Sequence, residues 1–259
     1  MIVAVHQGPY EELPAALAAA AEGGAALVVT AEMITTGYAI GAAAVAERAE
    51  PADGPLAQEL GMLARAHGVA LVYGYPERDG DTVYNSAQLL SAQGDRLANY
   101  RKTHLYGEID HSQFSPGADL VVQADLGGLR VGLLICYDVE FPEPVRAHAL
   151  AGTQLLLVPT ALMRPYERVA DALVPIRAHE SQLYVVYANR CDTEGELSYC
   201  GHSTVAAPDG TVTAAGEGPE LIFADVDPAV LARARTENTY LADRRPALYR
   251  SLTEEGPQA

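Results

Sequence analysis

The stretch Leu129-Arg-Val-Gly-Leu-Leu-Ile-Cys-Tyr-Asp-Val-Glu-Phe-Pro-Glu143 contains the clearest change from strand to helix in the chain. Its first half is a short apolar run after the Gly127-Gly128 turn, which predicts a buried strand. Phe141-Pro142 then opens a helical pattern that reaches about Leu150, because proline is tolerated in the first turn of a helix. Cys136 is therefore predicted to lie at a sharp strand-to-helix connection.

A cysteine at such a turn has two interpretations. Backbone N–H groups there stabilise a thiolate and a neighbouring oxyanion, which is what an acyl-transfer nucleophile requires. Free cysteine is also one of the most buried residue types, and Cys136 taken alone favours the role of a small apolar filler. Charged residues elsewhere in the chain decide between the two.

Two such residues stand at the ends of predicted strands. Glu32 follows the apolar segment Ala25 to Thr30, and Lys102 follows the segment Leu97 to Tyr100. A carboxylate directly after an apolar strand is partly desolvated, which raises its pKa toward values useful for general acid–base catalysis. Lys102 is also the only lysine among 17 basic residues. Its retention indicates a site that needs a compact, rotatable ammonium group.

With these residues in view, the sequence resembles the nitrilase superfamily, the carbon-nitrogen hydrolases, whose members carry a Glu-Lys-Cys triad in this chain order. The resemblance spans Ile2 to about Leu252. Its most specific piece is Cys136-Tyr-Asp-Val-Glu-Phe-Pro-Glu143, supported by Tyr100-Arg-Lys102 and Asp243-Arg-Arg-Pro-Ala-Leu-Tyr249. One difference is Thr30-Ala31, where the family usually has Phe-Pro or a similar pair before the first catalytic glutamate.

The resemblance implies a role for each site residue. Glu32 would take the proton of Cys136, while Lys102 and the backbone N–H of Tyr137 would stabilise the oxyanion. Glu108, in a segment from 105 to 117 that is predicted to be a loop over the site, would position the lysine or the substrate. Four further residues are expected to border the pocket: Tyr38, Tyr106, Phe141 and Thr160.

The implied reaction is the hydrolysis of a small carboxamide through a thioester, which needs no metal or organic cofactor. A zinc site is not expected, because Cys191 and Cys200 lack ligand partners at suitable spacing. Hydrolysis of N-carbamoyl compounds or nitriles stays open as an alternative within the family. A catalytically silent binding module on the same fold is less favoured, because all three triad residues are present.

The order of predicted elements defines the fold class. Strands alternate with helices and local hairpins, which indicates an α/β domain with a mixed sheet, and the pattern alone also allows a doubly wound sheet. The helices include one predicted from Pro165 to Gln182. Resemblance to the family implies a four-layer α-β-β-α sandwich with two mixed sheets. A single domain is expected over residues 1–259, with a C-terminal tail from about 241 to 259 in dimer contacts.

Composition limits the partners and the compartment. The chain has 34 acidic and 17 basic residues, a net charge of -17, which argues against nucleic acid or an anionic membrane surface. No apolar stretch approaches the roughly 18 residues that a membrane span requires. An odd number of cysteines, three, and no signal-peptide pattern favour a reducing, cytoplasmic setting. A small-molecule amide is the expected substrate, and a homodimer or higher homo-oligomer the expected assembly.

Overall fold

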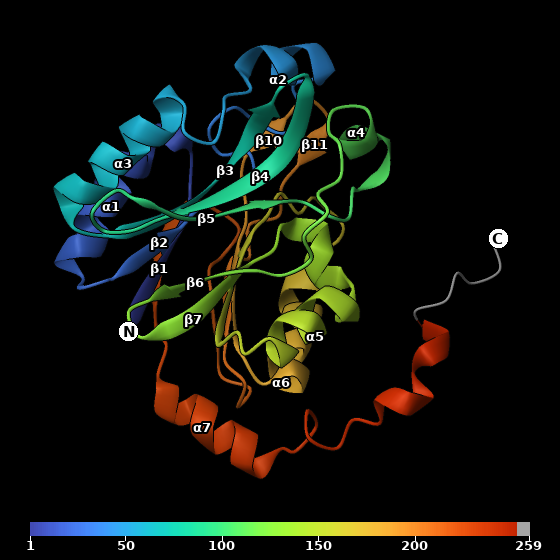
Figure 1. Ribbon diagram of the computed structural model, residues 1–259. Helices are drawn as coiled ribbons and strands as arrows, with labels where there is room; N and C mark the ends of the chain where they lie inside the picture. The colour runs from blue at the N-terminus through green and yellow to red at the C-terminus, as the bar shows by residue number, and fades with distance from the viewer. Residues whose placement is uncertain (253–259) are drawn as a thin grey trace.

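Two six-stranded sheets packed face to face form the centre of the protein (Figure 1). The computed structural model describes residues 1–252. The first sheet has the order β14-β1-β2-β3-β4-β5 and the second the order β13-β12-β9-β8-β7-β6. In each sheet three neighbouring strands are parallel, β1-β2-β3 in the first and β7-β8-β9 in the second, and the flanking strands are antiparallel. Both sheets are therefore mixed.

The strand bounds show how similarly the two sheets are built. The first sheet consists of β1 (Ile2–Gln7), β2 (Leu27–Val29), β3 (Ala70–Asp79), β4 (Thr82–Leu90), β5 (Arg96–Arg101) and β14 (Glu220–Asp225). The second consists of β6 (Val122–Leu126), β7 (Leu129–Leu133), β8 (Leu155–Pro159), β9 (Tyr184–Ala188), β12 (Thr204–Ala206) and β13 (Val212–Ala214). A separate small hairpin pairs β10 (Thr193–Glu194) with β11 (Leu197–Ser198).

Helices cover the outer face of each sheet. Helices α1 (Leu13–Glu22) and α3 (Pro55–His67) pack on the first sheet, and α5 (Pro142–Leu150) and α6 (Val174–Ser181) lie on the second (Figure 1). Shorter helices are α2 (Ala42–Arg48) and α4 (Gly107–His111), and α7 (Pro228–Glu237) follows the last strand. Short 3₁₀ turns occur at η1 (Tyr10–Glu12), η2 (Cys136–Glu140), η4 (Pro246–Leu248) and η5 (Arg250–Leu252).

Strand periodicity explains the four layers. Because side chains alternate between the faces of a strand, Val3 and Val5 of β1 enter the apolar core between the two sheets, whereas Ala4 enters the core beneath α1 and α3. Both faces of each central strand are thus buried, which accounts for their continuous apolar runs. The predicted four-layer α-β-β-α sandwich is confirmed, and the doubly wound alternative is excluded.

Two element predictions need correction. The helix predicted from Pro165 begins later, as a π-helical turn η3 (Val169–Leu173) that leads into α6. Pro175 explains the irregularity, because it lacks the N–H that an α-helix interior uses. The segment from 105 to 117, predicted as a loop, contains the short helix α4. Helix α2, strands β6 and β13 and the β10–β11 hairpin had no counterpart in the sequence-based prediction.

Candidate active site

The predicted triad residues come from the ends of strands in different sheets. Glu32 follows β2 and Lys102 follows β5, both in the first sheet, whereas Cys136 begins the η2 turn after β7 of the second sheet. The backbone N–H of Glu32 donates to the carbonyl oxygen of Thr160, just past β8, at 3.3 Å. This bond links the two sheets beside the site. The charges of Glu32 and Lys102 both act on the Cys136 thiol.

Lys102 is the centre of a buried charge cluster. Its Nζ donates to Oε1 of Glu32 at 2.8 Å and to Oδ2 of Asp110 at 2.7 Å, and all three side chains are fully buried. The same Oε1 accepts a bond of 2.7 Å from Nδ2 of Asn85. Oε2 of Glu32 is buried and has no hydrogen-bond partner among residues 1–252. Oε2 is therefore the oxygen of this carboxylate that is available to accept a proton.

Burial and charge set the protonation of the cluster. Burial raises the pKa of Glu32, opposed by Lys102 and reinforced by Asp110. Burial alone would lower the pKa of Lys102, but the facing carboxylates of Glu32 and Asp110 hold that pKa well above its usual value. Burial also raises the pKa of Cys136 well above its usual value, and the Glu32 charge adds to this against the opposing effect of Lys102. The sulfur is therefore a thiol at neutral pH and needs a base.

The Cys136 turn is tight and firmly anchored. Cys136 has a φ of 45°, in the left-handed region that L-residues rarely adopt and that occurs often at functional sites. Asp138, two residues later, accepts hydrogen bonds from the backbone N–H of Ile135 at 3.1 Å and from the Tyr100 hydroxyl at 2.9 Å. Its other oxygen accepts from the backbone N–H of His104 at 2.9 Å. Asp138 thus connects the turn that begins at Cys136 to the segment that carries Lys102.

Asp138 was not singled out from the sequence, although its position two residues after Cys136 could have indicated its role. An acid shortly after a predicted strand end is typical of a side chain that caps the following turn.

Asp110 occupies the place beside Lys102 that was predicted for Glu108. Glu108 lies in the first turn of α4 with an exposed side chain, and no bond to Lys102 is present in the described chain. Positions two apart on a helix point about 200° from one another. Asp110 accordingly points inward, where it accepts from the Tyr38 hydroxyl at 2.8 Å and from the Tyr106 backbone N–H at 2.8 Å. The acid that contacts the lysine is Asp110.

Cys136 opens onto a cavity of about 70 Å³. The cavity is bordered by aromatic and apolar side chains and by one carboxylate: Tyr38, Tyr106, Tyr137, Glu140, Ala161, Leu162, Met163 and Tyr166. Tyr38 and Tyr106 were predicted here. Phe141 and Thr160 were predicted but do not border it, because Phe141 stacks on His104 at 4.4 Å between ring centroids and Thr160 Oγ1 donates to the Val158 carbonyl.

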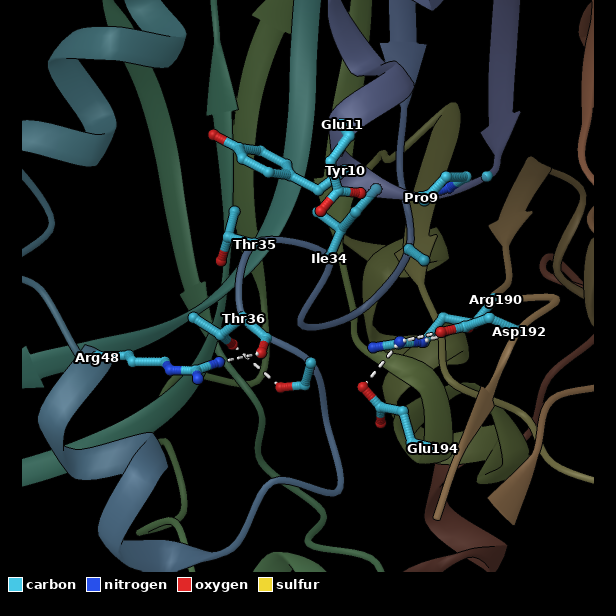
Figure 2. A pocket seen from close by; sticks show the side chains of 13 residues that line it. Pro9, Tyr10, Glu11, Ile34, Thr35, Thr36, Arg48, Arg190, Asp192 and Glu194 are labelled. Atoms are coloured by element: carbon cyan, nitrogen blue, oxygen red, sulfur yellow. Dashed lines mark hydrogen bonds and ion pairs between the residues drawn. The ribbon is translucent and has the colours of Figure 1, made fainter. Parts of the chain in front are cut away.

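A larger cavity of about 320 Å³ borders the chain segment that follows Glu32 (Figure 2). Its walls are polar, and none of the three triad residues lines it. Figure 2 shows Arg190 directed at Asp192 and Glu194, with ion pairs of 2.5 Å and 2.8 Å. The Glu194 carboxylate also accepts from the backbone N–H groups of Tyr38 and Ala39, at 3.1 and 2.9 Å. Glu194 thus holds the loop that carries Tyr38.

Among residues 1–252, no helix combines the length and apolar character that a bilayer span requires. No group of three or more His, Cys, Asp or Glu side chains in that range is arranged to hold a metal ion.

A buried carboxylate, an ammonium group and a thiol on a tight turn are the groups expected of a cysteine hydrolase site of the Glu-Lys-Cys type. Residues 7–236 match the family model for carbon-nitrogen hydrolases, and the chain belongs to this family. The predicted nitrilase-superfamily membership is confirmed.

Two Pseudomonas proteins are similar to most of this chain. A Pseudomonas protegens protein named "Hydrolase in pqqF 5'region" is 51% identical over 230 residues, which cover 88% of this chain and 81% of that protein. An (R)-stereoselective amidase from Pseudomonas sp is 38% identical, over 88% of this chain and 82% of that protein.

A related solved structure has a covalent adduct at its active-site cysteine. An amidase from Nesterenkonia sp. AN1, as a variant with the acetamide moiety of fluoroacetamide added covalently at its active-site cysteine, is 34% identical. The match covers 97% of this chain and 96% of that one, with a TM-score of 0.83. The same amidase has been solved in complex with butyramide.

Proposed function

We propose that this protein hydrolyses small carboxamides through a thioester on Cys136. The proposal rests on the surroundings of the Cys136 thiol. This thiol borders a cavity, and it feels the charge of the buried Glu32 carboxylate, whose Oε2 has no hydrogen-bond partner among residues 1–252. A related amidase with a covalent adduct at its active-site cysteine supports this chemistry, and a second relative is also named as an amidase.

The acylation step starts from neutral thiol and ionised Glu32. Oε2 of Glu32 takes the thiol proton while the sulfur attacks the amide carbonyl carbon, forming a tetrahedral oxyanion. Lys102 and the backbone N–H of Tyr137 stabilise that oxyanion. The C–N bond then breaks, protonated Glu32 returns the proton to the departing nitrogen, and ammonia or an amine leaves. Cys136 is left as a thioester.

Deacylation repeats the same proton movements. Glu32, ionised again, takes a proton from water while the oxygen attacks the thioester carbonyl. The C–S bond breaks, the proton passes to sulfur, and the carboxylic acid leaves. In both steps every proton that is removed is returned through Glu32, which acts first as a base and then as an acid.

Cavity size and the relatives favour amides over the other family substrates. A volume of about 70 Å³ suits a short acyl part, since a cavity of about 150 Å³ holds benzene. Hydrolysis of nitriles or N-carbamoyl compounds is the second candidate, supported by a 36% identical relative from Pyrococcus abyssi named as a nitrilase.

The test is a substrate panel with purified protein. Butyramide, propionamide, N-carbamoyl amino acids and short nitriles are compared by ammonia release and by carboxylate formation. We expect the carboxamides to be turned over fastest, and intact mass after acid quench to carry the acyl group on Cys136. Turnover of nitriles alone would overturn the amidase assignment, and binding without turnover would favour a silent binding module.

We also propose a domain organisation, a cellular compartment and an oligomeric state for the enzyme. Residues 1–259 act as one catalytic domain in the cytoplasm, where the thiol of Cys136 stays reduced; all three cysteines are free. The segment from 241 onward joins a second copy in a homodimer, although residues 253–259 of that prediction lie outside the described chain. Removal of residues 241–259 is expected to give monomers in analytical ultracentrifugation, and an unchanged dimer would refute the tail contact.

A further inference from the structure

Glu140 is a cavity residue that the proposed mechanism does not use. It is the last residue of η2, four positions after Cys136, and its half-buried side chain borders the same cavity as the thiol. Among residues 1–252 its carboxylate has no hydrogen bond and no ion pair. A carboxylate without a partner in a confined site is costly, because burial removes water that would otherwise solvate it.

The neighbouring cations are already engaged by other groups. Arg177 bonds the backbone carbonyl oxygen of Glu140 at 2.6 Å, and its side chain pairs with Glu180 at 2.9 Å. Lys102 is held by Glu32 and Asp110. Burial raises the pKa of Glu140, with Lys102 and Arg177 opposing the shift from a distance. The Glu140 carboxylate is therefore available to bind a group of a ligand that enters the cavity.

The rest of the cavity wall suits a cation. Four tyrosines border it, and the ring of Tyr137 packs edge-on against that of Tyr106 at 5.2 Å between centroids. Ring faces attract positive charge, and the polarisable thioether of Met163 lies in the same wall. A carboxylate within a set of aromatic rings is the usual chemistry of an ammonium-binding site.

We propose that Glu140 and the tyrosines around it select amides whose acyl part carries a protonated amine. The inference rests on the proposed amidase function, because the same cavity would hold the acyl part during attack by Cys136. The cavity limits that part to a short chain, so an amine two carbons from the carbonyl is a suitable probe. An acyl part with a carboxylate would be repelled by Glu140.

A charge series of matched length tests the selection. β-Alaninamide carries an ammonium group, butyramide is neutral and succinamate carries a carboxylate. For the unmodified protein we expect kcat/KM to fall in this order, with the cationic amide ahead of the neutral one by roughly 10- to 100-fold, as for a hydrogen bond between charged groups. In Glu140→Gln this ratio should fall at least tenfold and the anionic amide should gain on the neutral one.

A matched control separates charge recognition from general damage. Glu143 lies three residues further on, is exposed and does not border the cavity, so Glu143→Gln should leave the ratio between the amides unchanged. If Glu140→Gln lowered kcat/KM for all three amides by one common factor, Glu140 would act in folding or in the chemical step, and the selection would be refuted. A preference of the unmodified protein for butyramide or succinamate would refute it as well.

Binding of the amides to a non-reacting variant tests the charge selection without any need for turnover. In Cys136→Ala, calorimetry should give β-alaninamide a lower Kd than butyramide, and the added Glu140→Gln change should remove the difference. Absence of turnover in the unmodified protein would reject the amidase proposal alone, since these Kd values decide the selection. Equal Kd values for the two amides in Cys136→Ala would reject the selection alone.

Discussion

The two halves of the active site are built in opposite ways. On the first sheet, Lys102, Glu32 and Asp110 form a buried cluster in which charge is met by charge at 2.7–2.8 Å. On the second sheet, Cys136 occupies a left-handed backbone position beside an open cavity, and its thiol is kept neutral by burial. In the proposed mechanism, the first sheet holds the charged groups and the second sheet presents the nucleophile. Packing of the two sheets brings the two halves together into one candidate site.

Removing the nucleophile should have the largest effect. Cys136→Ala is expected to reduce kcat by at least 10⁴-fold, in keeping with the roughly 10⁶-fold cost of deleting a catalytic nucleophile elsewhere. The lost volume is small, so circular dichroism and thermal midpoint should stay close to those of the unmodified protein. Cys191→Ala is the control, because Cys191 lies outside the cavity and should be dispensable. Activity retained in Cys136→Ala would end the thioester mechanism.

Removing the base tests the other half. Glu32→Gln keeps the shape and is expected to lower kcat/KM by roughly 10² to 10⁴. The ionised form is the active one and its pKa is raised, so kcat/KM of the unmodified protein should fall on acidification through a pH above the usual carboxyl value of 4.5. Glu32→Gln should lose that acid limb. An acid limb that persists in the variant would assign the titration to another group.

Lys102→Arg asks whether charge alone is enough. The larger planar guanidinium cannot replace a compact ammonium held between two buried carboxylates, so we expect a loss of roughly 10² to 10³, close to that of Lys102→Ala. Arg101→Lys, at the neighbouring half-exposed position paired with Glu77, serves as the control and should be mild. A folded Lys102→Arg protein with more than about a third of the original rate would contradict the oxyanion role.

Asp110→Asn probes the support of the lysine. It removes one of the two carboxylates bonded to Lys102, and a loss of roughly 10- to 100-fold in kcat is expected for a buried charged hydrogen bond. Glu108→Gln is the natural comparison, because that acid is exposed two residues earlier. If Glu108→Gln proved the more damaging change, the sequence-based prediction of a positioning role for Glu108 would be supported and the role given to Asp110 would be rejected.

The smallest effect is expected from Glu194, which is paired with Arg190 in Figure 2. Glu194→Ala removes the acceptor for the backbone N–H groups of Tyr38 and Ala39, and should raise KM by roughly three- to tenfold with a smaller change in kcat. Asp192→Ala also takes an acid from Arg190 but leaves the loop bonds intact. Equal effects of the two changes would mean that the Arg190 ion pairs matter and the loop contact does not.

Local pattern predicted an α/β domain with a mixed sheet and drew attention to the three proposed triad positions, whereas the four-layer sandwich was predicted from the family resemblance. Apolar runs and proline-initiated helices are local signals, so β7, α5 and the position of Cys136 between them could be read from neighbouring residues. Glu32 and Lys102 were singled out at predicted strand ends, and only the family resemblance joined them to Cys136 in one predicted site, because sequence distance gives no measure of contact across two sheets.

The pocket residues depend on side-chain direction. Glu108 and Asp110 differ only in the face of a five-residue helix that each occupies, and so short a helix has no clear periodic pattern. Phe141 sits next to the cavity residue Glu140 but turns to stack on His104. These side-chain directions depend on packing between segments that are distant in the sequence, and the order of residues does not reveal that packing.

The lone lysine has a consequence for the lifetime of the enzyme. A thioester reacts readily with a free primary amine, and an amide formed on the protein itself would block the site permanently. Lys102 is the only side-chain amine in the chain, and the carboxylates of Glu32 and Asp110 keep it protonated by raising its pKa. An ammonium ion has no lone pair with which to attack. In the proposed reaction, the cluster that would supply positive charge to the oxyanion would thereby also protect the protein from acylating itself.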